Sequence, residues 1–233
     1  MITRPVLDYV PRLDERNKAH RISALREVAP ADQPVYWNPG VVLDQGQDGS
    51  CVGHGVVAEY LASPVRGRFV RENRPGPYEA EAGHEEAVAV YNRAKEIDEW
   101  EGVNYDGTSV RAGMLVGRER GWYGGFAWAM NTDELRTALR EGPVVLGIEV
   151  RENMFDPDHG LLDIGGTVAG GHCILATGYT PFYRRAKGPA YRLRNSWGTS
   201  WALNGSAYIR EADLAEILFG TGGEAAVPTG RHL

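Results

Sequence analysis

One cysteine of this chain stands where its thiol could act as a nucleophile. Cys51 follows a segment with two glycines, Asp44–Ser50, and apolar residues at helical spacing predict a helix that begins at Cys51 and is stopped by Pro64 and Gly67. Unpaired N–H groups at a helix N-terminus lower a thiol's pKa and can hold an oxyanion, and the side-chain amide of Gln45 could add a second donor. The competing interpretation is that Cys51 is a small buried apolar residue.

A histidine and an asparagine stand further along the chain at the ends of predicted strands. His172 follows two glycines and opens the apolar run His172–Tyr179, so its ring would lie at the mouth of a strand and could act as a base near neutral pH. Asn195 ends another run and could accept a hydrogen bond from that ring, while Trp197 could keep water away from the bond. Taken singly, each residue is more typical of a structural role.

Together these segments resemble the papain-like cysteine peptidases. The resemblance rests on four motifs in the family's order, and it spans roughly residues 36–210. It implies an α+β fold of two lobes, a helical lobe that carries Cys51 and a β-rich, barrel-like lobe that carries His172 and Asn195. The motifs are Gln45-Gly46, Gly49-Ser50-Cys51, Gly171-His172 and Asn195-Ser196-Trp197-Gly198.

The resemblance also implies roles for these residues. Cys51 would attack a peptide carbonyl and form a thioester, and Gln45 would hold the oxyanion together with the Cys51 N–H. His172 would pair with the thiolate and protonate the leaving amine, and Asn195 would orient His172.

Substrate contacts are implied less directly. Gly171 and Trp197 flank the proposed base and the residue that orients it, and are expected to line the cleft. Gly107 resembles the glycine whose backbone holds an extended substrate in this family, although an ordinary turn before a helix would explain it equally well.

The sequence departs from the family pattern at two positions near the cysteine. Asp48 and Val52 stand where the family commonly has a second cysteine and an aromatic residue. Asp48 cannot form the usual disulfide, which points to a disulfide-free microbial or phage-type branch. The interval from Cys51 to His172 is short against the roughly 130–150 residues of the family, and Thr180–Pro189 would form an added hairpin tip.

Neither a metal nor a cofactor is expected. Cys51 and His54 have the spacing of a ligand pair, but no further ligands accompany them, and the segment from His84 lacks the second histidine of a zinc-protease helix. Cys173 should point away from His172 into the core, because side chains alternate along a strand.

The remaining pattern places helices before strands, which favours the α+β class. We expect an N-terminal arm at 1–35, a peptidase domain at 36–219 with lobes at roughly 36–130 and 131–219, and a mobile tail at 220–233. The arm is interpreted as a wrapping segment, with a short inhibitory pro-region as the alternative. Further helices are predicted at 84–97, 110–120 and 132–141, and strands at 144–150, 172–179, 190–194 and 206–210.

Composition limits the partners and the compartment. The 233 residues carry a net charge of −6, which gives no basic surplus for nucleic acid, and four arginines in one Gly- and Pro-containing stretch are interpreted as a solvated loop. Two cysteines, no signal-peptide pattern and no long apolar run favour a cytoplasmic protein that binds no membrane. The resemblance implies a polypeptide substrate, and a monomer is expected. The four arginines are Arg66, Arg68, Arg71 and Arg74.

Three functions compete on this evidence. The first is an active endopeptidase. The second is an exopeptidase or another amide or isopeptide hydrolase on the same fold, which residues 1–35 or the arginine-containing loop would favour by closing one end of the cleft. The third is a catalytically silent binding module, which would be expected to lack one of the four catalytic candidates, and all four are present.

Overall fold

The chain places its helices before most of its strands, as expected. The computed structural model describes residues 4–9, 14–29, 33–65, 79–99 and 106–231, so the arginine-containing loop lies outside the described residues. The long helices are α1 (Cys51–Leu61), α3 (Ala80–Ile97), α4 (Val110–Glu119) and α5 (Thr132–Leu139), followed late in the chain by the short α6 (Glu211–Ala215). The strands are β1 (Val35–Tyr36), β2 (Tyr123–Trp128), β3 (Val144–Arg151), β4 (Val168–Tyr183), β5 (Gly188–Arg194), β6 (Ser206–Arg210) and β7 (Glu224–Arg231).

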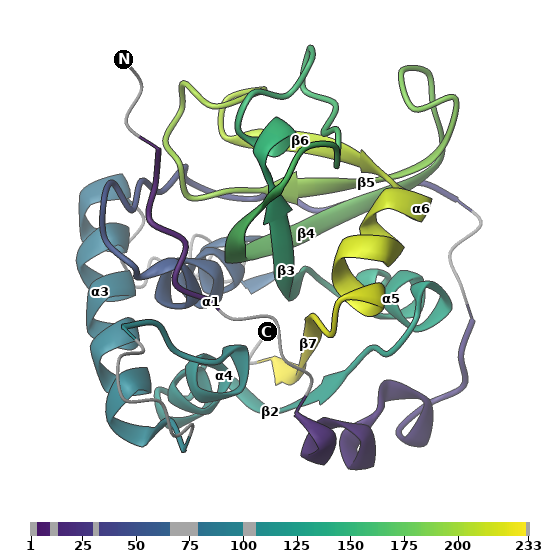
Figure 1. The fold of residues 1–233 in the computed structure, drawn as a ribbon. Coiled ribbons are helices and arrows are strands. Elements are labelled where there is room, and N and C mark those ends of the chain that lie inside the picture. The colour runs from purple at the N-terminus through teal and green to yellow at the C-terminus, as the bar shows by residue number, and fades with distance from the viewer. Residues whose placement is uncertain (1–3, 10–13, 30–32, 66–78, 100–105, 232–233) are drawn as a thin grey trace.

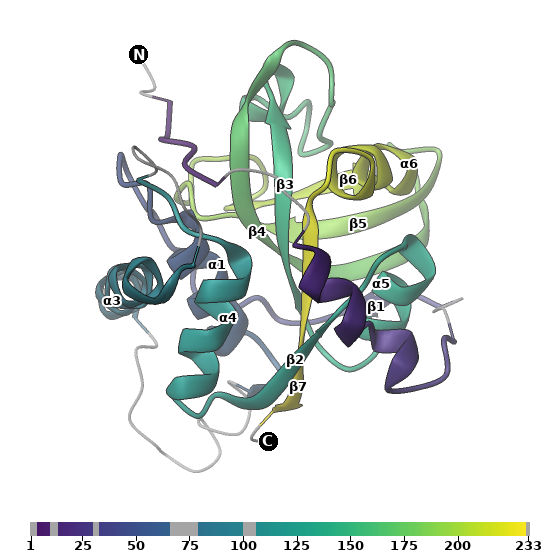
Figure 2. The ribbon, with the colours of Figure 1, turned by 60° about the horizontal axis from the view of Figure 1, so that its bottom comes forward.

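The strands form one antiparallel sheet in the order β2-β7-β3-β4-β5-β6, with β1 paired to β4. The helices α1, α3 and α4 lie together beside this sheet (Figures 1 and 2). The segment Thr180–Pro189 extends β4 and β5 into the expected hairpin, in which Tyr183 pairs with Gly188.

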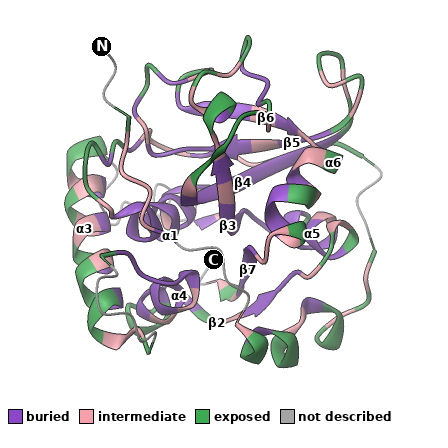
Figure 3. Cartoon of the chain, in the orientation of Figure 1, coloured by how far each residue is buried: buried purple, intermediate pink, exposed green. Residues whose placement is uncertain are grey.

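Alternation along the central strands creates two hydrophobic cores. Leu146 and Ile174 face the core of the β-rich part, whereas their neighbours Val145 and Leu175 face the core around α1, α3 and α4. Figure 3 shows β3, β4 and α1 as mostly buried ribbon. The core around the helices therefore includes residues of β3, β4 and β7 as well as of α1, α3 and α4.

Helix α1 is buried on nearly every side, although its sequence predicts a single apolar face. Only Tyr60 of its 11 residues is not fully buried. Gly53 makes this possible, because any Cβ there would collide with the backbone of α3 at Ala87. The buried helix holds Cys51, its first residue, in a fixed place.

One helix start differs from the prediction. Helix α3 begins at Ala80 rather than near His84. Helix α5 begins at Thr132 as predicted and is capped by Asn131, whose Oδ1 accepts a hydrogen bond from the Glu134 N–H at 2.9 Å. Helix α4 is capped by Ser109, whose Oγ accepts a hydrogen bond from the Ala112 N–H at 3.1 Å.

The C-terminal residues differ most from the prediction. Instead of a mobile tail, Glu224–Arg231 form β7 between β2 and β3, and the Arg231 Nε lies 2.8 Å from the Glu59 Oε1 of α1. Small side chains at Ala225 and Ala226 let β7 enter the sheet interior, where both are buried. Their small size also explains why the segment lacked a strand signal.

The N-terminal arm lies along the surface of the rest of the protein. It forms two short 3₁₀ helices, η1 (Glu15–His20) and η2 (Ile22–Ala24). Among the described helices, none combines the length and hydropathy that a membrane crossing requires.

Candidate active site

Three elements bring the sequence-predicted residues together where the helical part meets the sheet. Helix α1 begins at Cys51, β4 carries His172 opposite Ile148 of β3, and Asn195 directly follows β5. The side chains of all three predicted residues are buried.

A short hydrogen bond fixes the histidine ring. The His172 Nε2 lies 2.7 Å from the Asn195 Oδ1, which also accepts the Ser196 N–H at 2.8 Å. Because an amide oxygen can only accept, Nε2 carries a proton and Nδ1 of the neutral ring does not. That Nδ1 is buried without a hydrogen-bond partner. The Trp197 ring covers the imidazole at a centroid distance of 4.8 Å.

Gln45 is held from both ends of its amide. Its Oε1 accepts a hydrogen bond from the Ser196 Oγ at 2.8 Å, and its Nε2 donates to the Asp48 carbonyl at 2.9 Å. The Gln45 N–H also donates to the Ser196 carbonyl at 2.9 Å. These bonds join the loop before α1 to the loop after β5. Sequence reasoning missed Ser196 as a partner of Gln45, because 151 residues separate the two.

The side-chain amide of Gln45 also donates a hydrogen bond to the N-terminal arm. Its Nε2 donates to the Val6 carbonyl at 3.3 Å. Tyr9 pairs with Gly171 in an antiparallel bridge, and a Cβ at Gly49 would collide with the Asp8 carboxylate. In Figures 1 and 2 the arm runs between the helices and β4. Residues 4–9 therefore lie over the site.

This cover changes the electrostatics of the cysteine. Burial raises the pKa of the Cys51 thiol to about 11, and Asp8 adds to the rise, although the backbone N–H groups of Cys173, Tyr9 and Val52 favour the thiolate. The sequence predicted a lowered pKa from the helix N-terminus alone. Desolvation prevails because only 1% of Cys51 is exposed.

The pKa of the histidine is shifted downward, opposite to that of the cysteine. Burial lowers the pKa of His172 to about 4, although the hydrogen bond from its ring to Asn195 opposes the shift. With Cys51 also shifted, the covered site holds a neutral thiol and a neutral imidazole near pH 7.

The predicted substrate contacts lie around the arm. Trp197 and Phe155 line a cavity of 710 Å³ that Arg4 and Pro5 also border. Gly171 lines a second cavity, of 300 Å³, that Leu7 and Tyr9 of the arm also border. Gly107 is buried, and its neighbour Asp106 lines a third cavity of 450 Å³ that Val6 and Asp8 border.

The residues set aside as metal ligands have other partners. The His54 Nδ1 lies 2.9 Å from the Ser50 carbonyl, and its Nε2 lies 3.1 Å from the His84 Nδ1. Cys173 packs on α1, where a Cβ at Gly55 would lie 2.5 Å from its Sγ. Across the described part of the chain, no three His, Cys, Asp or Glu side chains gather in a way that could hold a metal ion.

The family model of the papain family cysteine proteases matches residues 69–218, more than half of the chain. The chain belongs to the papain family of cysteine proteases. It is therefore a cysteine peptidase, and the resemblance inferred from the four motifs is confirmed. The matched stretch contains His172 and Asn195 and begins beyond Cys51, whose surroundings depart from the family pattern. None of the curated proteins compared with the chain matches it.

Solved structures of papain-family proteases share the fold. Xylellain, a cysteine protease from Xylella fastidiosa, superposes with a TM-score of 0.64 at 18% identity, over 99% of this chain and 98% of that chain. The proform of the ragweed pollen cysteine protease Amb a 11 gives a TM-score of 0.64 at 16% identity, over 95% of this chain and 65% of that chain. Bromelain from Ananas comosus, in complex with the E64 inhibitor, gives 0.58 at 14% identity, over 86% and 100%. The expected papain-like α+β fold is confirmed.

Proposed function

We propose that Cys51 is the nucleophile of this peptidase, His172 its base and Asn195 the residue that orients the base. The observation that carries the proposal is the bond from the His172 Nε2 to the Asn195 Oδ1, because it leaves the buried Nδ1 as the free basic nitrogen. Cys51 would give its proton to Nδ1 and attack the carbonyl carbon of the substrate. His172 would then protonate the leaving amine, and water would hydrolyse the thioester.

Gln45 would stabilise the oxyanion in this scheme. In the covered site its Nε2 already donates to a carbonyl oxygen, that of Val6. A scissile carbonyl that replaced Val6 would meet the same donor, with the Cys51 N–H as the second. The bonds from Ser196 and to Asp48 support this role, since they fix the amide before any substrate arrives.

An extended polypeptide would pass over the site in one direction. The amine leaves toward His172, so the substrate residues that follow the scissile bond would lie beside Trp197, whose ring covers the imidazole. The residues that precede the bond would lie along Gly171 and near Gly107. Cavities border the arm on both sides of Val6, which favours an endopeptidase over an exopeptidase with one blocked end.

The arm runs in the opposite direction. Its N-terminal residues Arg4 and Pro5 border the cavity of Trp197, and its later residue Tyr9 pairs with Gly171. A reversed chain presents its amide bonds to Cys51 in the wrong orientation for the leaving amine to receive the proton of His172. We therefore favour the inhibitory pro-region over a purely wrapping arm.

Covalent labelling tests these assignments. An epoxide inactivator selective for papain-like thiolates is added to the full chain and to the full-length Tyr9→Ala variant, in which the cover is weakened, and labelling is measured by intact mass. We expect one label on Tyr9→Ala, none once Cys51→Ala is added, and nearly none once His172→Ala is added. A label that persists without Cys51, or complete resistance of Tyr9→Ala, would refute the assignment.

Other expectations from the sequence stay predictions. These are a monomeric state, a cytoplasmic location and no partner other than a polypeptide substrate. Size-exclusion chromatography with light scattering tests the first of them directly.

A further inference from the structure

The hairpin between β4 and β5 carries a group of positive charges. Its turn contains Arg184, Arg185 and Lys187, which are all exposed, and β5 adds Arg192. None of these four side chains forms an ion pair within the described part of the chain. Burial and the charge of Arg192 together lower the pKa of Arg194 to about 10, so positive charge continues along β5. The hairpin is therefore a basic patch on a chain whose net charge is −6.

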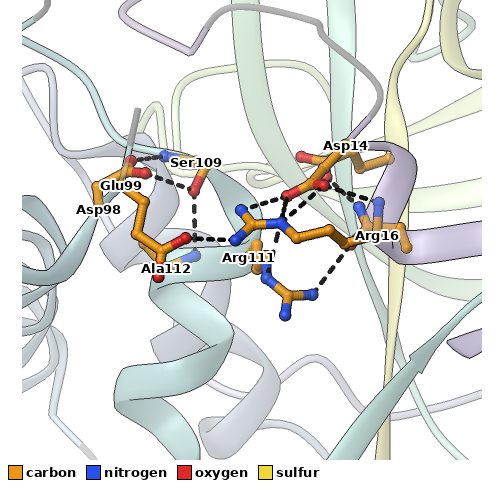
Figure 4. A network of polar contacts seen from close by, with 9 residues as sticks. Asp14, Arg16, Asp98, Glu99, Ser109, Arg111 and Ala112 are labelled. Carbon is orange, nitrogen blue, oxygen red and sulfur yellow. Dashed lines mark hydrogen bonds and ion pairs between the residues drawn. The ribbon is translucent and has the colours of Figure 1, made fainter. Parts of the chain in front are cut away.

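Arginines on another part of the surface are paired with acidic side chains. The Arg16 Nε donates to the Asp14 Oδ2 at 2.9 Å, and the same guanidinium also pairs with Glu99. The Arg111 Nε lies 4.0 Å from the Asp14 Oδ2. Figure 4 shows these groups between η1 and the start of α4. Acidic residues outnumber basic ones by 31 to 25, so a cluster of cations without such partners stands out, and its electric field attracts acidic groups from solution.

The hairpin is held in place although it projects from the sheet. In Figure 1 it extends from the right-hand ends of β4 and β5. The Tyr183 ring stacks on the Tyr208 ring of β6 at a centroid distance of 4.1 Å. Lys187 has a φ of 55°, a conformation that favours glycine or asparagine over a long side chain, so the turn presents a charge where a glycine would be less strained. A patch fixed in this way loses little conformational entropy when a partner binds.

An aromatic side chain is exposed beside these charges. Phe182 is 66% exposed, and the Thr180 Oγ1 fixes its backbone by donating to the Phe182 carbonyl at 3.0 Å. Aromatic side chains and arginines are enriched at protein–protein interfaces and among the residues that contribute most to binding. The hairpin thus offers a ring to an apolar residue of a partner and cations to its carboxylates.

We propose that the hairpin of residues 180–189 is a second binding site for the polypeptide substrate, and that it recognises an acidic segment that contains an apolar residue. The proposal rests on the proposed function, because the chain that binds the hairpin is the one that Cys51 cleaves. A polypeptide is favoured over other anions because the chain belongs to a family of proteases. Opposite charges on the hairpin and the segment would speed their encounter and fix their relative orientation.

Strand β4 sets the distance between this second site and the catalytic candidates. It carries His172 near its start and ends at Tyr183, so about 11 residues at about 3.3 Å each separate the two by about 36 Å. An extended substrate covers that span with about 11 residues. The acidic segment should therefore lie about that far from the scissile bond. Because the contact does not involve the reacting atoms, it should lower KM and leave kcat unchanged.

Peptide binding to the full-length Cys51→Ala chain tests the site without cleavage. The probe is a fluorescein-labelled peptide of glutamates with one phenylalanine, and Kd is measured by anisotropy. We expect Kd to rise with added salt, and to rise about tenfold or more in the triple variant Arg184→Glu, Arg185→Glu, Lys187→Glu. Arg118→Glu is the matched control and should leave Kd unchanged, because Arg118 is exposed on α4 and likewise has no ion-pair partner among the residues that the structure describes.

A single substitution covers the case in which the triple variant does not fold. Lys187→Gly removes one charge and relieves the left-handed conformation of the turn. It should therefore raise Kd while it leaves Tm unchanged or higher. An unchanged Kd in Lys187→Gly would contradict the proposal.

Cleavage tests whether the bound segment belongs to the substrate. Quenched fluorescent peptides with randomised residues around the scissile bond are given to the full-length Tyr9→Ala chain. The acidic segment is placed on either side of the bond, after a spacer of about 3 or about 15 residues. We expect KM to fall about tenfold with the long spacer on one side only, with kcat unchanged, and the gain to vanish in the triple variant.

Several results would overturn the proposal. They are equal Kd values for the glutamate peptide and its glutamine counterpart, a gain that does not depend on the spacer, and tighter binding of a single-stranded oligonucleotide or of phosphatidylserine vesicles than of the peptide. Cleavage that the acidic segment does not affect refutes this inference alone. Binding of the peptide without cleavage of any substrate by Tyr9→Ala refutes the proposed function.

Discussion

Removal of the Tyr9 ring should convert the covered peptidase into an openly reactive one. In Tyr9→Ala the arm loses a fully buried aromatic ring and the hydrogen bond to Glu224. Truncation of a buried aromatic side chain costs about 3–5 kcal/mol. The contacts of the arm that remain include the 3.3 Å bond from the Gln45 Nε2 to the Val6 carbonyl. The open fraction of the arm should therefore rise by about 100- to 3,000-fold, at 1.4 kcal/mol for each factor of ten.

The assay is the second-order rate of epoxide labelling at pH 7, followed by intact mass. When opening limits access to the thiol, this rate is proportional to the open fraction. Tyr36→Ala is the matched control, because Tyr36 is 49% exposed and lies in β1, away from Cys51. It should label at the native rate. Equal labelling rates for the native chain and Tyr9→Ala would refute the reasoning, since the arm would then not limit access.

Three further predictions follow from single contacts. Ser196→Ala removes the donor to the Gln45 Oε1 and should lower kcat by about tenfold with KM little changed, measured on an arm-weakened chain. Arg231→Met leaves Glu59 buried without its partner and should cost about 3–5 kcal/mol in urea unfolding. Burial raises the pKa of Glu59 above its ordinary value of 4.5. The penalty should therefore be small below about pH 4.5, where the carboxyl is protonated in the folded and the unfolded chain, and should grow as the pH rises and the unfolded carboxyl ionises. A penalty independent of pH would contradict the assignment. In the native chain, labelling of Cys51 should keep rising toward pH 11, whereas in Tyr9→Ala it should level off at lower pH, as rate profiles over pH would show.

The catalytic candidates could be predicted because short motifs contain them. The two glycines before His172 and the run from Asn195 to Trp197 each specify one local geometry, and the fold brings the two segments together at 2.7 Å. The α1 start was likewise predictable, since apolar spacing begins at Cys51 itself. Local patterns of this kind act within a few residues, so one sequence is enough to find them.

The cover over the site could not be predicted in the same way. The bond from Gln45 reaches a backbone carbonyl of Val6, and every residue type supplies that group. Tyr9 and Glu224 are 215 residues apart, so no local pattern links them. The direction of the Cys51 pKa shift was predicted wrongly for the same reason. The helix N-terminus can be recognised in the sequence, but the burial that outweighs its effect on the thiol cannot.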